Sequence, residues 1–310
     1  MTSRASHEIA GAEADARPAA DSRRTRAGVA YALAAFSTWG LVVPLHFKLL
    51  AAVPALEILA QRIVWASVFA LGLIALGRRL GELARTLVPG RRLALLSLSA
   101  SLVATNWLTY IWAVNAGHLV QTSLGYFINP LVNVGLGILF LGERLRPAQI
   151  AACALAAAGV LVLTVSAGEM PWVALTLAVS FGFYGLVRKI VAVEPLIGFC
   201  VESLMLAPLA LAFLAAALAQ GHAAAFQGDG QLDLLLVLTG LSTAAPLIWF
   251  AAAAQRLKLS TVGLLQYLAP TGQLALGPFV YGEPFGLTDL VAFGAIWAAL
   301  AIYTVSALRS

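Results

Sequence analysis

Hydroxyl and amide side chains interrupt an apolar run of the sequence at GYFINPLVNVGLG, residues 125–137. On an α-helix, Tyr126, Asn129 and Asn133 follow one another at intervals of three and four residues and therefore share one face. A phenol and two amides can hydrogen-bond a solute in a water-filled cavity without holding any particular charge. The stripe is thus a candidate solute-binding surface.

Similar residues lie on two further apolar runs. Gln266 and Gln273 are about two helical turns apart, so they also share a face. Asn106 and Tyr110 are one turn apart on another run, next to Trp107. An aromatic and amide lining of this kind suits small amphipathic solutes. We therefore include Gln266, Gln273, Asn106 and Tyr110 in the candidate site.

Two accounts of the polar stripe compete. In the first, the amides join helices by hydrogen bonds, worth about 0.6 kcal/mol on average, and Gly137 and Gly277 let the helices approach closely. In the second, Tyr126, Asn129 and Gln266 face a central cavity and bind solute or water. The internal repeat described below favours the second account for these three residues, because such repeats place their sites between the halves.

Arg62 and Glu202 are the ionisable residues that we expect deepest in the membrane. An ionisable group at this depth is a functional-site hypothesis by default. Arg62 lies about 12 Å past Pro54 and Glu202 about 10 Å past Pro195 along their helices. Because the two approach the midplane from opposite faces, we do not expect a tight ion pair. Arg62 is a candidate for contact with substrate, and Glu202 for carrying a coupling proton.

The composition shows which elements must position these side chains. Hydrophobic residues make up 61% of the 310 residues and charged residues only 11%, far below the roughly 25% of a soluble domain. Apolar runs long enough to cross a bilayer as helices recur along the chain. We predict an all-α polytopic membrane protein with ten transmembrane helices, at residues 28–50, 54–77, 92–117, 119–141, 147–167, 171–190, 195–219, 231–256, 260–282 and 287–308.

The basic residues orient these spans. With the N-terminus inside, every Lys and Arg except Lys48 and Arg62 falls on one side of the membrane. This bias is the positive-inside signature and predicts that both termini are cytoplasmic. Residues 1–27 read as a disordered cytoplasmic tail. The net charge of +5 therefore reflects topology and contact with the lipid bilayer, and we expect no nucleic-acid partner.

The chain also repeats itself. An offset of 140 residues places Pro130 on Pro270, and Gly142-Glu143 on Gly282-Glu283. The halves are 28–167 and 171–308, with five spans each. An odd number of spans inverts the second half in the membrane, and inverted repeats are typical of secondary transporters. We expect the two Gly-Glu pairs to end helices, with each Gly left-handed and each Glu capping the next helix.

Several segments resemble a known family: NWLTYIWAVN, SLGYFINPLVN, FLGERLR, FYGLVRK, AVEPL and RLKLSTVGLLQYLAPT. They are similar to RarD-type members of the EamA family, in the drug/metabolite transporter superfamily. The resemblance covers about residues 26–308. It implies a bacterial inner-membrane permease with two EamA-like halves, a small-molecule solute as its partner, and no cofactor. It names no physiological substrate.

We therefore predict a secondary-type exporter of small amphipathic metabolites or drugs that works by alternating access. The alternatives are an intramembrane enzyme, a lipid flippase and a membrane scaffold that transports nothing. An enzyme is disfavoured because the four histidines are scattered and no H-E-x-x-H, G-x-S-x-G or phosphate-loop motif is present. The sequence carries no signal for a metal site or an oligomeric state, and apart from the candidate Glu202 it does not distinguish ion coupling from uniport.

Overall fold

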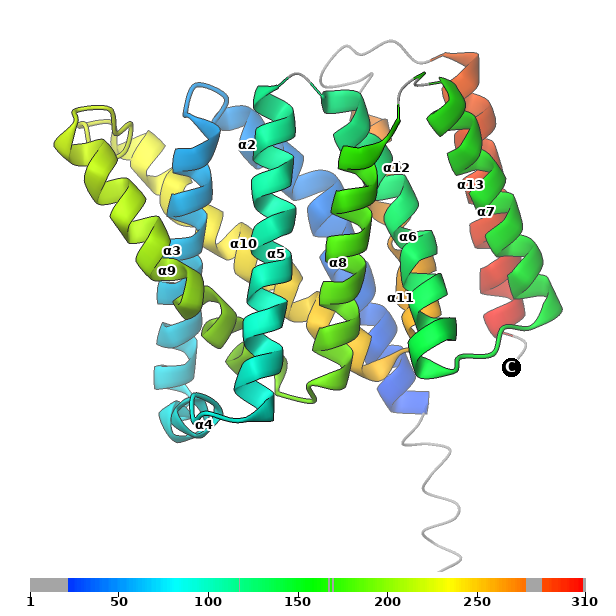
Figure 1. Ribbon diagram of the computed structural model, residues 1–310, viewed down its shortest axis with the longest axis horizontal. Coiled ribbons are helices and arrows are strands. Elements are labelled where there is room, and N and C mark those ends of the chain that lie inside the picture. The colour runs from blue at the N-terminus through cyan, green and yellow to red at the C-terminus, as the bar shows by residue number, and fades with distance from the viewer. Residues whose placement is uncertain (1–21, 117, 167, 169, 277–285, 309–310) are drawn as a thin grey trace, which may run out of the picture.

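The computed structural model describes residues 22–308 except 117, 167, 169 and 277–285 (Figure 1). Within these residues every regular element is a helix. After a first helical segment that begins at Ser22, the elements are η1 (Thr38–Val42), α2 (Val43–Leu49), α3 (Ala55–Leu76), α4 (Leu80–Thr86), α5 (Arg91–Asn115), α6 (Leu119–Leu141), α7 (Pro147–Ser166), α8 (Trp172–Ile190), α9 (Pro195–Ala219), α10 (Gly230–Arg256), α11 (Leu259–Leu265), α12 (Leu268–Leu276) and α13 (Leu287–Leu308).

Eight helices within the described residues are long and apolar enough to cross a membrane, and Leu290–Ser306 of α13 forms a shorter apolar helix. The prediction of an all-helical, multi-pass membrane protein is confirmed. The predicted span 260–282 is not one continuous helix, because α11 ends at Leu265 and α12 begins at Leu268. Its last residues lie outside the described part of the chain, so the count of ten spans stays a prediction.

The first span differs from its prediction at two points. Its helix begins at Ser22 and runs to Leu49, so it starts before the predicted position 28. Within it, η1 is a short π-helix in which Val43 N–H donates to Thr38 O. Pro44 follows directly, and a proline ring clashes with the carbonyl one turn earlier in a regular α-helix. The wider π turn fits this proline into the span.

Small residues decide where the long helices cross. A Cβ atom built on Gly240 of α10 would lie 2.5 Å from the backbone carbonyl carbon of Trp65 in α3. One built on Gly263 of α11 would lie 2.6 Å from Pro130 O in α6. Both distances are shorter than real Cβ contacts. The α3–α10 and α6–α11 crossings are therefore backbone-to-backbone contacts that only glycine permits.

An aromatic cluster occupies the centre of the largest core. The rings of Phe36, Trp39, Phe181, Tyr184 and Phe250 lie 5.1 to 6.2 Å apart, centroid to centroid, in tilted, edge-on and stacked pairs. They come from the first span, α8 and α10. Interlocking rings of this kind fix the relative positions of three helices from both ends of the sequence.

The bundle has two distinct edges in Figure 1. One edge, which we call the α4 edge, holds the short helix α4, the start of the first described helix and the end of α13. The connection between α9 and α10 lies at the other, which we call the far edge. The connection from α2 to α3 is also at the far edge, because α3 runs from it to α4. Each functional residue can be placed by its distance from these edges.

Candidate functional site

A cavity of about 150 Å³ lies near the far edge, where α2, α3 and α5 meet. Its lining combines one cation, two aromatic rings from α5, one from α2, and aliphatic side chains: Phe47, Ala55, Ile58, Leu59, Arg62, Trp107, Tyr110 and Ile111. The sequence predicted Arg62 and Tyr110 as site residues. Phe47 at the end of α2 was not predicted, because nothing in the sequence shows that α2 packs beside α3 and α5 here.

Arg62 lies about two turns into α3 and is half-buried. Its Nε donates a hydrogen bond of 3.0 Å to Thr243 Oγ1 of α10. Its guanidinium carbon lies 4.5 Å from the ring centroid of Trp107 and 5.7 Å from that of Phe47. Contact with aromatic faces stabilises a guanidinium away from water. The charge is therefore held in a fixed place at the cavity.

Tyr126 of α6 does not line this cavity but contacts Tyr110, which does. Its ring packs edge-on against that of Tyr110, with centroids 6.4 Å apart. The Tyr126 side chain is 38% exposed, although its neighbours on α6 are mostly buried. The structure thus places Arg62 and Tyr110 at one cavity and Tyr126 against Tyr110, and their role as a shared site stays a prediction.

The amides on the neighbouring helices bind the backbone of α8 instead. Asn129 donates to Ala178 O at 2.6 Å. Asn106 donates to Leu177 O at 2.9 Å and to Ser180 Oγ at 3.1 Å. Asn129 is only 2% exposed. These two residues attach α6 and α5 to the same stretch of α8.

The remaining amides join helices from the two halves of the sequence. Asn133 Nδ2 donates to Gln266 Oε1 at 2.9 Å and lies 3.3 Å from Asn129 Oδ1. Gln273 Nε2 donates to Trp39 O, in the π turn of the first span, at 3.3 Å. In this conformation Asn129, Asn133 and Gln266 are buried and have protein partners. Their contacts are those expected of amides that hold helices together.

A second polar cluster lies toward the α4 edge and is almost completely buried. The Glu202 carboxylate accepts hydrogen bonds from Ser99 Oγ at 2.5 Å, Tyr184 Oη at 3.4 Å and Arg188 Nη1 at 3.3 Å. Arg188 Nη2 also donates to Pro195 O at 3.0 Å. We call Ser99, Tyr184, Arg188 and Glu202 the Glu202 cluster. It joins the beginnings of α5 and α9 to the end of α8.

The sequence did not predict the place of Arg188. It was counted among the basic residues outside the membrane, yet its side chain is 0% exposed and belongs to the last turn of α8. A Cβ atom at Gly198 would overlap the Arg188 guanidinium, so glycine at this position makes room for it. The available signal was the spacing of Tyr184 and Arg188, one turn apart on the face that meets Glu202.

Two contacts outside the spans fix the α4 edge. Arg79 Nη2 lies 2.8 Å from Glu82 Oε2 and 3.4 Å from Glu194 Oε2, and so joins α4 to the start of α9. The hydrogen bond from Arg79 holds the pKa of the Glu82 carboxyl below its usual range. Glu194 also accepts from Ile197 N–H and caps α9.

The first Gly-Glu pair is structural, as predicted, but its partner differs. Gly142 ends α6 in the left-handed conformation with φ of 62°. Glu143 accepts hydrogen bonds from Leu259 N–H, Ser260 N–H and Ser260 Oγ, at 2.6 to 2.9 Å. It therefore caps α11 and not the next helix, α7, because α11 crosses α6 near this end. The predicted counterparts Gly277, Gly282 and Glu283 lie outside the described residues.

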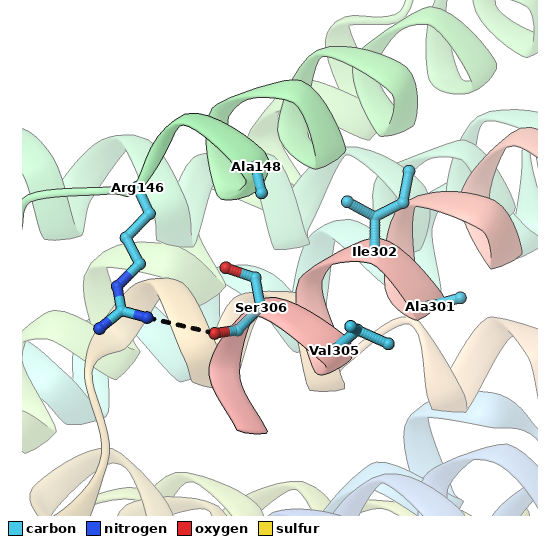
Figure 2. Close-up of a pocket in the computed structure, with 6 residues that line it drawn as sticks. All are labelled: Arg146, Ala148, Ala301, Ile302, Val305 and Ser306. Carbon is cyan, nitrogen blue, oxygen red and sulfur yellow. Dashed lines mark hydrogen bonds between the residues drawn. The ribbon is translucent and has the colours of Figure 1, made fainter. Parts of the chain in front are cut away.

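A larger hollow of about 510 Å³ lies between α7 and α13, at the outer side of the bundle. Figure 2 shows Arg146 reaching from the start of α7 toward Ser306 of α13, whose carbonyl oxygen it contacts at 3.4 Å. The other lining residues are Ala148, Ala301, Ile302 and Val305. Aliphatic side chains at this surface suit lipid contact. Among the described residues, no group of three or more His, Cys, Asp or Glu could hold a metal ion.

Comparisons with known proteins agree with this architecture. The profile of the EamA-like transporter family matches residues 26–165. Protein RarD of Salmonella typhi is 46% identical over 288 residues, 93% of this chain and 98% of that protein. An uncharacterized transporter of Vibrio cholerae is 44% identical over 290 residues, 94% of this chain and 96% of that one. A crystal structure with 21% sequence identity has a TM-score of 0.69 and covers 93% of this chain and 98% of its own, which shows the fold alone.

The helical bundle and these relatives define a multi-pass transporter of the bacterial inner membrane. The chain belongs to the EamA-like transporter family, and within it is similar throughout its length to the RarD proteins.

Proposed function

We propose that this transporter exports small amphipathic metabolites or drugs by alternating access, as a secondary-type permease. The observation that carries the proposal is the contrast between the two edges of the bundle. The cavity with Arg62 lies toward the far edge, and the Glu202 cluster lies toward the α4 edge. Along α5, Ser99 and Trp107 are about 12 Å apart. A cavity near one edge and a packed polar seal near the other suit one end state of such a cycle.

The opposite end state requires the seal to separate and the cavity to close. The Glu202 cluster joins three helices through hydrogen bonds to one carboxylate. Protonation of Glu202 would remove the negative charge that holds Arg188, so we assign Glu202 the role of coupling residue. A buried ion pair of this kind costs free energy through desolvation, and its best-attested use is to specify one of two arrangements. Here it would specify the arrangement with the α4 edge closed.

An inverted repeat would supply two equivalent end states. We propose the halves 28–167 and 171–308, with ten spans. Three pairs of packed helices support this division, namely α3 with α9, α6 with α11 and α7 with α13. In each pair, the two helices hold the same position in the order of their own halves. Similar contacts occur in the two halves. Gln273 donates to Trp39 O in the first span, and Asn133, 140 residues before Gln273, lies near Gly185 of α8.

The proposed solute site combines the predicted residues in two roles. Arg62 and Tyr110 contact the solute in this conformation, since they line the cavity, and Tyr126, which packs against Tyr110, completes this group. Asn106, Asn129, Asn133, Gln266 and Gln273 hold α5, α6, α11 and α12 in place here. The same amides meet the solute when these helices move apart. Both accounts of the polar stripe then apply, each in one end state.

Metabolite profiles of cells that lack or overproduce the protein test this proposal. A solute that accumulates in the cells on deletion, and in the medium on overproduction, supports export. The reverse pattern contradicts export. Purified protein in liposomes separates the rival classes: a scaffold moves nothing, a flippase moves only lipid, and an intramembrane enzyme releases a chemically altered product.

A further inference from the structure

We infer that the solute of this site carries a carboxylate on a small apolar body, and that Arg62 binds the carboxylate. The inference rests on the proposed function and names the substrate class of the same cavity. In the described part of the chain, the charge at the cavity is not balanced by a neighbouring side chain. Arg62 is a cation in an apolar part of the bundle, and none of the ion pairs among the described residues includes it.

The hydrogen bonds of Arg62 leave most of its donors to a ligand. A guanidinium has five N–H donors, and the structure gives this one a single hydrogen bond, from Nε to Thr243 Oγ1. Thr243 in turn donates to Thr239 O at 2.7 Å, which fixes the orientation of its hydroxyl. The planar pair of Nη groups matches the two oxygens of a carboxylate, and such bidentate pairs are among the strongest hydrogen bonds in proteins.

The neighbouring rings make an arginine more suitable than a lysine at this position. The faces of Trp107 and Phe47 lie 4.5 and 5.7 Å from the guanidinium carbon. Stacked rings hold the plane of a guanidinium and leave its edge for hydrogen bonding. The aliphatic side chains of Ile58, Leu59 and Ile111 complete the wall. They fit an apolar body, while Arg62 fits an anionic end.

The same lining disfavours cations. No acidic side chain lines the cavity among the described residues. Glu57, on the same helix as Arg62, is only 2% exposed, and its carboxylate accepts from Ala224 N–H and Ala225 N–H. The Glu202 carboxylate is bound by its own cluster. A positively charged solute would therefore be repelled by Arg62, with no acidic side chain in the described lining to compensate. Such repulsion between like charges costs on the order of several kcal/mol at low dielectric.

The test measures binding to the full-length protein in lipid nanodiscs. The probes are benzoate, phenylacetate and hexanoate, each paired with its primary amide as a neutral isostere, and benzylamine as a cation. We expect at least one carboxylate to bind more tightly than its amide, and benzylamine not to bind. Arg62→Gln should weaken carboxylate binding by about 30-fold or more, since one partner of a buried charge pair is removed.

Three further variants keep the result interpretable. Arg62→Lys retains the charge but loses the planar pair of donors, and should bind with intermediate affinity. Thr243→Val frees the guanidinium and should weaken carboxylates while leaving the amides unchanged. Arg85→Gln, which removes an exposed arginine of α4, is the matched control and should bind as the unmodified protein does.

The inference is overturned if no carboxylate binds better than its amide, or if folded Arg62→Gln or Arg62→Lys keeps the full preference. Movement of the same probes across liposomes separates this inference from the proposed function. Arg62-dependent binding without movement contradicts transport and supports the carboxylate site. Movement of uncharged or cationic solutes that is unchanged in Arg62→Gln supports transport and contradicts the carboxylate site.

Discussion

At the scale of single residues, the polar side chains of one helix face have different environments. Tyr126 and Asn129 are close neighbours on α6, yet Tyr126 is 38% exposed and Asn129 only 2%. Asn129 has a hydrogen bond to Ala178 O, whereas the ring of Tyr126 lies against Tyr110 at the cavity. In this conformation, the difference in exposure and partners distinguishes Tyr126 from Asn129, which holds two helices together.

Replacing each of these two residues by leucine should therefore have different effects. Asn129→Leu removes an interhelical hydrogen bond and should lower the free energy of unfolding by about 0.6 to 2 kcal/mol. It should also reduce transport per folded molecule, because Asn129 meets the solute in the other end state. Tyr126→Leu should leave thermal stability unchanged and reduce transport per folded molecule. Thermal unfolding and transport are measured on the same preparations. Equal losses of stability in the two variants would contradict this assignment.

The sequence places these residues on one helix face, but it does not predict their hydrogen-bond partners. A period of three and four residues is enough to place Tyr126, Asn129 and Asn133 on one face. The acceptor of Asn129 is a backbone carbonyl of Ala178, and any residue type can supply such an oxygen. The position of this carbonyl opposite Asn129 depends on how α6 and α8 pack. A local sequence pattern carries no information about that packing. Arg188 illustrates the same limit, since a helix-end arginine usually reaches water.

At the scale of helices, apolar length predicted most of the spans, because a bilayer imposes a minimum length on every crossing. The boundaries of α3, α9 and α10 agree with their predictions to within a few residues. The π turn in the first span and the break at Gln266 and Tyr267 were not predicted. At the π turn a neighbouring helix contributes, because Gln273 donates a hydrogen bond to Trp39 O, and no local sequence pattern shows such a partner.

The helix crossings give a direct test of packing. Gly240→Ala places a methyl group within 2.5 Å of the backbone of Trp65, so α3 and α10 must move apart. We expect a loss of about 1 to 3 kcal/mol in the free energy of unfolding. Gly72→Ala in α3 is the matched control, because nothing lies within 4 Å of its added methyl group. It should be neutral or slightly stabilising, since alanine favours a helix. Thermal unfolding in detergent measures both, and similar midpoints would contradict the close crossing.

At the scale of the whole molecule, the arrangement of charge and of chain ends defines an orientation. The helix α4, which has Arg79 at its N-cap and Arg85 in its last turn, lies at the same edge as the start of the first helix and the end of α13 (Figure 1). The α9–α10 connection, with Asp229 and Asp233, lies at the far edge. Arginine near the ends of spans favours the cytoplasmic side. We therefore propose that the α4 edge, with both termini, faces the cytoplasm and the far edge faces outward.

Cysteine labelling tests this orientation. The starting protein is Cys153→Ala with Cys200→Ala, so that no native thiol reacts. The far-edge probe is Gln227→Cys, because Gly228 has φ of 101° and would be strained by any side chain. The cytoplasmic probe is Arg85→Cys, an exposed position on α4. In intact spheroplasts, an impermeant maleimide should label Gln227→Cys and should label Arg85→Cys only after the membrane is broken. The opposite pattern would show the reverse orientation. Equal labelling of the two cysteines in intact spheroplasts would contradict an arrangement that places positions 85 and 227 on opposite sides of the membrane.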